Sequence, residues 1–118
     1  MENTKLNVYG TKFVKANKSL RPIDVILMEG NGNYTWVYLA NGTKKLYSKT
    51  MNLMSEEFQT NDFIRIHKSY SINLNHIKYR DESNDLTLIL TNGLKAEVSR
   101  RKRKEFLSII NLFSTQKN

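Results

Sequence analysis

The sequence contains no cysteine and only one proline among its 118 residues. Without cysteine the chain can form neither disulfides nor thiolate metal sites, which fits a reducing compartment. No apolar run approaches the roughly twenty residues of a membrane span, and residues 1–10 lack the hydrophobic segment of a signal peptide. We therefore expect a cytoplasmic protein that makes no membrane contact.

Residues and motifs typical of catalysis are also scarce. There are two histidines, His67 and His76, and no carboxylate cluster at metal-ligand spacing. The sequence has no Walker loop, dinucleotide fingerprint or nucleophile elbow. Glu29, beside a Gly-Asn loop, has the chemistry of a general acid or base, but a salt bridge at the loop edge is the commoner role for such a residue. We expect no enzymatic activity, no metal and no cofactor.

What the sequence does contain is a series of short runs rich in aromatic and β-branched residues, separated by turn residues. These runs predict strands at residues 13–16, 26–29, 34–39, 44–48, 86–90 and 95–98. Asn41-Gly42 and Asn92-Gly93 predict tight hairpins, and residues 30–33 predict a flexible loop. Tyr34, Trp36 and Tyr38 share one strand face, which predicts that this aromatic face packs into the core.

Two segments have helical spacing instead. Met51, Met54 and Phe58 form an apolar stripe over residues 51–58, and a similar pattern runs from about Arg101 to residue 113. The chain has no Gly/Ser-rich tract that would separate domains. We predict one mostly-β domain at residues 13–113 with two short helices, preceded by a lead-in at 1–12 and followed by a frayed tail at 114–118.

Residues 63–74 nearly form one long strand, because Ile64, Ile66, Tyr70 and Ile72 all fall on even positions. Lys68 occupies the even position at the middle, where a straight strand would bury its ammonium without a partner. A turn or bulge at residues 67–69 avoids this cost and brings Lys68 to the surface. We therefore predict a break that displays Lys68.

The charge is strongly positive. Lysine and arginine outnumber acidic residues by 19 to 11, a formal net charge of +8, and residues 100–104 are all basic. Ser99 is a plausible N-cap for the last helix, so this basic run falls at a helix N-terminus, where cations are unfavourable for folding. Clustered cations at a helix N-terminus suit an incoming phosphate, and such a balance favours nucleic acid as the partner.

Five segments, in order and at approximate spacing, resemble the LytTR DNA-binding domain. They are DVILMEG at 24–30, GNYT at 32–35, FIRIHKSY at 63–70, INL at 72–74 and VSRR at 98–101. The resemblance extends from about residue 13 to 112 and implies an elongated arrangement of small, mainly antiparallel sheets with one or two short helices. Members of this family are bacterial transcription regulators, which insert loops into successive major grooves of a repeated double-stranded DNA site and bend it. The resemblance thus implies a sequence-specific regulator that binds repeats as a dimer.

The resemblance also implies three contact regions on this chain. The first is Asn33 with Gly32 and Tyr34, the second is Lys68 with His67 and Ser69, and the third is Arg101 with Arg100, Lys102 and Arg103. Asparagine, lysine and arginine are able to read base edges. Asn73, also typical of the family, is expected to satisfy backbone groups within the fold, and His67 is at least as suited to a hydrogen bond within its turn.

Two other functions remain open from the residues alone. An RNA-binding or single-stranded nucleic-acid-binding β module would need aromatic side chains exposed on an open sheet face. A regulator that binds only protein would direct its basic surface at an acidic partner. Most LytTR relatives carry a receiver domain or membrane helices, for which the residues before the resembling segment are too few. We expect a stand-alone, response-regulator-like protein or a fragment, whose upstream signalling partner the sequence does not identify.

Overall fold

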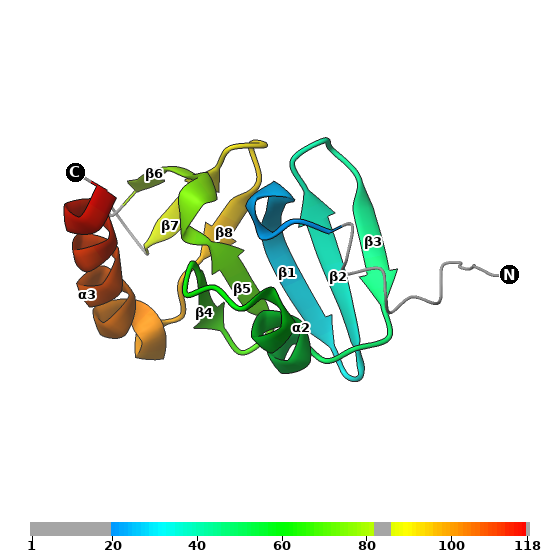
Figure 1. Ribbon diagram of the computed structural model, residues 1–118. Helices are drawn as coiled ribbons and strands as arrows, with labels where there is room; N and C mark the ends of the chain where they lie inside the picture. Colours follow the sequence, from blue (N-terminus) through cyan, green and yellow to red (C-terminus); the bar gives the residue numbers. More distant parts are fainter. Residues whose placement is uncertain (1–19, 82–85, 118) are drawn as a thin grey trace, which may run out of the picture.

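The computed structural model describes residues 20–81 and 86–117, the side chains of 113–117 excepted, and contains two antiparallel sheets (Figure 1). The larger sheet has five strands in the order β3-β2-β1-β5-β4, and the smaller has three in the order β6-β7-β8. The strands of the larger sheet are β1 Val25–Asn31, β2 Tyr34–Leu39, β3 Lys44–Tyr47, β4 Phe63–His67 and β5 Tyr70–Asn73. The smaller sheet comprises β6 Ile77–Asp81, β7 Thr87–Leu90 and β8 Lys95–Glu97. The mostly-β prediction is confirmed.

Four helical segments accompany the sheets. The two α-helices are α2 Met51–Phe58 and α3 Arg100–Lys117, and two short 3-10 turns are η1 Pro22–Asp24 and η2 Leu74–His76. Helix α2 matches the predicted range, with the Thr50 hydroxyl accepting from Leu53 N–H at 3.2 Å and Gln59 ending it in a left-handed conformation. Helix α3 continues through residues 114–117, which the sequence assigned to a frayed tail. The helix is therefore longer than the range ending at residue 113, and the fraying of its end stays a prediction.

Two hydrophobic clusters hold the fold. The first lies between one face of the larger sheet and α2, where Met51, Met54 and Phe58 pack on residues such as Val37. The second lies where the two sheets and α3 meet, and includes Ile66, Ile72, Leu88 and Phe106. Figure 1 shows α3 beside the smaller sheet and α2 in front of the larger one. Helix α2 therefore buries the apolar stripe from which it was inferred, and α3 buries Phe106 and Ile110 of its stripe.

The first hairpin is tighter than predicted. Gly30 and Asn31 belong to β1, Asn31 pairs with Tyr34, and only Gly32 and Asn33 make the turn. Gly32 has φ of 63°, a conformation that glycine adopts without a steric cost. The flexible loop expected at residues 30–33 is thus a two-residue turn with a defined register. The hairpins at Asn41-Gly42 and Asn92-Gly93 are present as predicted, whereas the strand expected at 13–16 lies outside the described residues.

The prediction for the aromatic face of β2 is wrong for Tyr34 and Trp36, whereas Tyr38 packs against the second cluster. Thr35, Val37 and Leu39 are the buried residues of this strand, whereas Tyr34 is 49% exposed. Trp36 and Tyr38 are half-buried on the face opposite α2. The Thr35 hydroxyl donates to the Lys49 carbonyl at 2.7 Å, which satisfies a polar group on the buried face. Aromatic content alone therefore did not identify the core-facing side of the strand.

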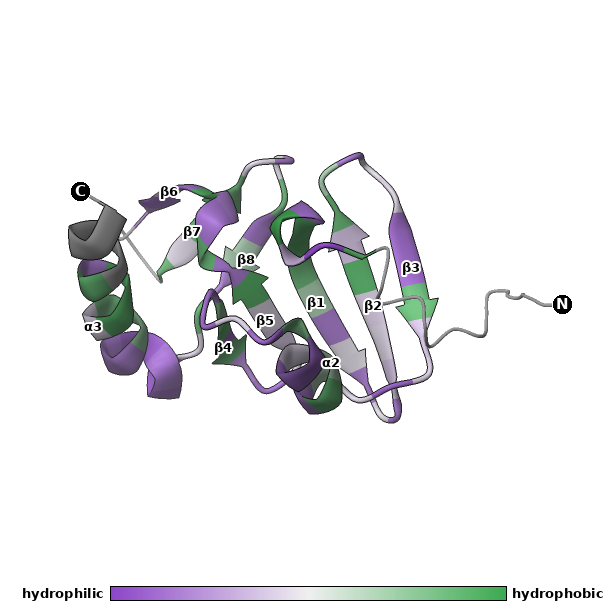
Figure 2. Ribbon diagram, viewed as in Figure 1, coloured by the Kyte–Doolittle hydropathy of each residue, from purple (hydrophilic) through white to green (hydrophobic). Residues whose placement is uncertain are grey.

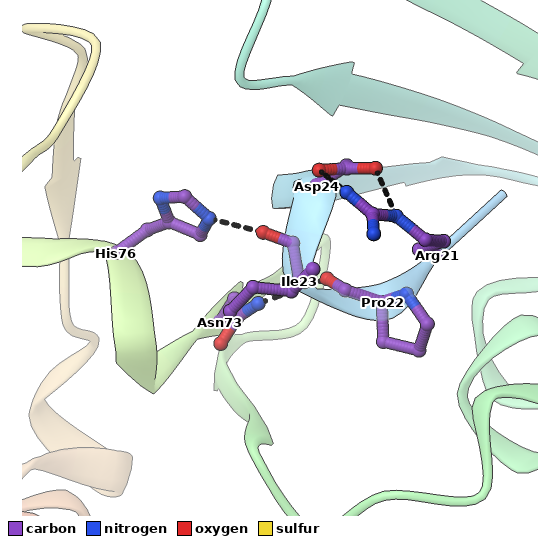
Figure 3. Close-up of polar contacts among 6 residues, drawn as sticks. All are labelled: Arg21, Pro22, Ile23, Asp24, Asn73 and His76. Carbon is purple, nitrogen blue, oxygen red and sulfur yellow. Dashed lines mark hydrogen bonds and ion pairs between the residues drawn. The ribbon is translucent and has the colours of Figure 1, made fainter.

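Asn73, the last residue of β5, hydrogen-bonds backbone groups of neighbouring segments, as the sequence predicts. Its Nδ2 donates to the carbonyls of Pro22 at 3.0 Å and Val25 at 2.9 Å, and its Oδ1 accepts from Asn75 N–H at 2.9 Å. Figure 3 shows Asn73 beneath η1, with His76 Nε2 2.6 Å from the Ile23 carbonyl. These contacts fix the corner from which β1 begins.

Candidate nucleic-acid interface

The predicted break at Lys68 is a complete reversal of the chain. Strand β4 ends at His67, Lys68 and Ser69 form the turn, and β5 returns from Tyr70. The pairing shifts by one residue between Arg65 and His67, which marks an irregularity of the kind that re-aims side chains. Lys68 is exposed, while Ile66 is fully buried. The displayed lysine is therefore confirmed as a structural feature.

Three hydrogen bonds hold the backbone of this turn. Ser69 N–H donates to His67 Nδ1 at 3.1 Å, Arg65 Nη2 donates to the Lys68 carbonyl at 3.1 Å, and Gly30 N–H donates to the Ser69 carbonyl at 2.9 Å. Because a backbone N–H only donates, Nδ1 of His67 is the unprotonated ring nitrogen. The hydrogen bond expected for His67 within the turn is present. The Lys68 side chain therefore projects from a turn whose backbone is fixed.

The second segment is the β1–β2 turn, in which Gly32, Asn33 and Tyr34 are all exposed. Gly30 lies two residues before Gly32, and its bond to Ser69 fixes the position of this turn relative to Lys68. A hollow of about 240 Å³ lies between the two turns, lined by residues that include Gly32, Arg65 and Lys68. The two turns are therefore adjacent and form one surface.

The third segment is the start of α3, which a backbone bond ties to β4. Ser99 N–H donates to the Ile66 carbonyl at 2.9 Å, and Lys102 N–H donates to the Ser99 carbonyl at 3.0 Å. Ser99 thus stands directly before the helix, as predicted, although the expected bond of its hydroxyl stays a prediction. Arg100 and Arg101 are exposed, and the fully buried Phe106 anchors the helix farther along.

The rest of the basic run is less exposed than its sequence suggests. Lys102 and Arg103 are half-buried. Lys104 is exposed, as are Arg100 and Arg101. The Lys102 ammonium lies 3.8 Å from Glu105, a partly exposed pair that salt will screen. Figure 2 shows the first turns of α3 as hydrophilic, with hydrophobic residues following. The helix therefore presents its charge at its N-terminal end.

All three segments lie along one edge of the molecule. Figure 1 shows the β1–β2 turn, the β4–β5 turn and the first turn of α3 along the lower side of the view. The edge carries exposed Lys68, Arg100 and Arg101 together with the partial positive charge of a helix N-terminus. Such a surface attracts polyanions, and its asparagine, lysine and arginine side chains are able to hydrogen-bond base edges.

Comparison with known proteins identifies the fold. The sequence profile of the LytTr DNA-binding domain matches residues 15–111, which is most of the chain. The chain belongs to the LytTR family. It is 38% identical over 87 residues to the transcriptional regulatory protein LytR of Staphylococcus aureus strains N315 and NCTC 8325 / PS 47. The match covers 70% of this chain and 35% of each relative, so the chain spans about a third of their length.

The solved structures agree. A LytTr DNA-binding domain from Bacillus cereus superposes with a TM-score of 0.65 at 23% sequence identity, covering 75% of this chain and 82% of that one. At this identity the likeness concerns the fold. The LytTR domain described above therefore has the arrangement of antiparallel sheets with short helices that the resemblance of its motifs implied.

One residue that contacts the Lys68 turn was not singled out from the sequence. Arg65 is half-buried on the face of β4 opposite Ile64 and Ile66, where an arginine is ordinary for a surface strand. What distinguishes Arg65 is its contacts with α2 and with the Lys68 turn, and the spacing of apolar residues along the sequence does not reveal such contacts. The only available signal was its place three residues before the lysine.

The Glu29 carboxylate accepts hydrogen bonds from two tyrosine hydroxyls. Its two carboxylate oxygens accept from the hydroxyls of Tyr38 at 2.9 Å and Tyr70 at 3.4 Å. Burial and then the bond to Glu29 raise the pKa of Tyr38 to about 12, and the negative charge of Glu29 is the main cause that raises the pKa of Tyr70. These tyrosines lie beside a hollow of about 480 Å³ between the sheets. Glu29 thus serves the packing of this face.

Neither a metal centre nor a membrane helix is found in the described residues. Across 20–81 and 86–117, no group of three His, Asp or Glu side chains is placed to hold a metal ion. No helix in that part of the chain is long and apolar enough to cross a membrane.

Proposed function

We propose that this LytTR domain is a sequence-specific double-stranded DNA-binding transcription regulator. One observation carries the proposal: three segments far apart in sequence meet on one edge, and backbone hydrogen bonds from Gly30 to Ser69 and from Ser99 to Ile66 link them. A surface of this kind holds several reading side chains in one arrangement before DNA arrives, which lowers the entropic cost of binding. The names of the relatives, which describe transcriptional regulation and DNA binding, support the same function.

In this proposal the two β-turns and the start of α3 enter major grooves, and the protein reads a repeated site as a dimer. Asn33 suits adenine, while Lys68 and Arg101 suit guanine. Gly32, Tyr34, His67 and Ser69 shape the two turns. Arg100, Lys102 and Arg103 contact phosphates, which fix register without sequence information. An upstream signalling partner would act on this assembly in the cytoplasm.

The alternative of a single-strand or RNA-binding module draws support from the exposed side of β2. Tyr34 and Trp36 lie on a sheet face that α2 leaves uncovered, as stacking would require. However, the Lys44 ammonium lies 4.4 Å from the centre of the Trp36 ring, and the Tyr38 hydroxyl donates to Glu29, whose negative charge repels phosphates. Because Trp36 and Tyr38 already have these partners, the face is less suited to stacking bases, and this favours duplex DNA as the ligand of the basic edge.

The deciding experiment is selection of binding sites from random duplex DNA. Enrichment of a repeated sequence is expected, and its spacing gives the groove geometry. Competition of the selected duplex against single-stranded DNA and RNA of the same sequence separates the two classes. Preference for either single strand, with no enriched duplex, would refute the proposal.

A second experiment tests whether Arg101 contacts a base. Arg101→Ala is expected to cost about 1–3 kcal/mol at the selected site, with the loss confined to one base position in a panel of single-base variants. Arg21→Ala is the control, because it removes the same charge from an exposed arginine directly before η1, at the end of β1 away from the β1–β2 turn (Figures 1 and 3). An even loss of affinity across the panel would make Arg101 a phosphate contact.

A further inference from the structure

Arg65 connects the Lys68 turn of the proposed interface to helix α2. Its Nη1 donates to Asn52 Oδ1 in α2 at 3.0 Å, and its Nη2 donates to the Lys68 carbonyl at 3.1 Å. The side chain therefore bridges the helix and the turn that displays Lys68. It also lines the hollow between that turn and the β1–β2 turn.

The bridge needs the shape of an arginine. The guanidinium is planar and rigid, so its two terminal nitrogens hold two acceptors at a fixed separation. A lysine carries the same charge at a single nitrogen on a flexible stem and does not reproduce this geometry. Asn52 and the Lys68 backbone are thereby held in one arrangement by one side chain.

One feature of this arrangement lowers the stability of the fold. Within the described residues the Nε–H of Arg65 is buried without a hydrogen-bond partner, which is unfavourable for a buried donor. Local features that work against folding are concentrated at functional sites. Here the two bonded nitrogens act on the turn whose lysine is proposed to read a base.

We propose that Arg65 is a positioning residue that sets the Lys68 turn against α2 and the β1–β2 turn, and so determines how selectively the domain reads DNA. The inference rests on the proposed function. Arg65 fixes the Lys68 carbonyl, Gly30 fixes the Ser69 carbonyl, and His67 fixes the Ser69 N–H. With Arg65 replaced, the Lys68 side of the turn loses its tie, so the turn opens more often and its remaining bonds, including Ser69 N–H to His67, break with it.

The test compares Arg65→Lys with the matched control Arg21→Lys, which makes the same exchange in the exposed pair with Asp24. The selected duplex and a scrambled duplex are titrated with each protein. Arg65→Lys is expected to weaken binding to the selected duplex about tenfold, the size of coupling typical within one hydrogen-bond network. Its affinity for the scrambled duplex and its salt slope should match wild type, because the net charge is unchanged. The control should change neither.

A double-variant cycle distinguishes positioning from general loosening of the fold. In a Lys68→Ala background, Arg65→Lys should cause no further loss, because the side chain that it positions is gone. Equal losses in both backgrounds would overturn the proposal, as would unchanged selectivity in Arg65→Lys. A parallel loss on the selected and scrambled duplexes would make Arg65 a phosphate contact instead.

Hydrogen exchange keeps the inference separate from the proposed function. The Ser69 amide should exchange faster in Arg65→Lys than in wild type, while the Phe106 amide in α3 should be unchanged. If the wild-type protein selects no duplex, the proposed function fails, and the exchange result still decides whether Arg65 holds the turn. Unchanged exchange at Ser69 would overturn the positioning role.

Discussion

Replacing Asn73 by alanine is expected to be among the most damaging single changes in the protein. The side chain is 1% exposed, and its Nδ2 supplies hydrogen bonds to the carbonyls of Pro22 and Val25. Its orientation is unambiguous, because carbonyls only accept and the Asn75 N–H that donates to Oδ1 only donates. Alanine removes both donors and the acceptor together.

The magnitude follows from the groups that lose a partner. A buried polar group left without a hydrogen bond costs about 1–3 kcal/mol, so the two carbonyls together predict a loss of about 2–6 kcal/mol. A domain of this size is stable by about 5–15 kcal/mol, so the variant should fold but with a clearly lower denaturant midpoint. Asn73→Asp should be worse at neutral pH, because its carboxylate would face the two carbonyl oxygens.

Urea denaturation, with the free energy of unfolding and its denaturant slope fitted together, measures this loss. Asn41→Ala is the matched control, because Asn41 Oδ1 accepts from the Thr43 N–H in an exposed hairpin turn. Its cost should stay near or below about 1 kcal/mol, as for most surface changes. If Asn73→Ala costs no more than Asn41→Ala at equal slope, the argument from buried donors is refuted.

Three further predictions concern the interface and the aromatic face. Because Lys68 is exposed, Lys68→Leu should leave the free energy of unfolding within about 0.5 kcal/mol of wild type. The same change should weaken binding to the selected duplex. A clear gain in stability with unchanged affinity would contradict this. Lys104→Ala should flatten the slope of log K against log salt by about one unit if Lys104 contacts a phosphate, and an unchanged slope would exclude that contact. Because burial and Glu29 raise the pKa of Tyr38 from 10.0 to about 12, the stability that this group contributes is present below pH 10 and lost as the pH rises toward 12. The stability difference between wild type and Tyr38→Phe should therefore shrink over that range in denaturant melts, and a constant difference would disprove the linkage.

The features that sequence predicted are those with a local cause. Helix α2 was predictable because Met51, Met54 and Phe58 lie on one helical face, whatever that face packs against. The turn at Lys68 was predictable because burying an unpaired ammonium is costly in any fold. Both arguments use only the chain's own periodicity and the solvation of a single group.

The features that sequence did not predict depend on partners distant in the chain. Strand β2 alternates equally well with either face inward, and the position of α2 decides that Thr35 and Val37 are buried while Tyr34 is exposed. Strand β6 shows no alternation, since residues 78–81 are all exposed, and it exists because Ile77 and its neighbours pair with β7. The bridging role of Arg65 likewise needs the spatial meeting of α2 with the β4–β5 turn.

The charge at the start of α3 shows how the fold accommodates an interface that folding alone would not favour. Cations in the first turn of a helix are unfavourable by a few tenths of a kcal/mol each, and residues 100–104 are all basic. Farther along, Phe106 is fully buried in the cluster where the two sheets and α3 meet, and burying such a side chain contributes about 1.5–3 kcal/mol. The backbone bond from Ser99 to Ile66 secures the same end of the helix to β4. The unfavourable charge is thus carried by a helix whose position the core determines, and an arriving phosphate would turn that charge into binding free energy.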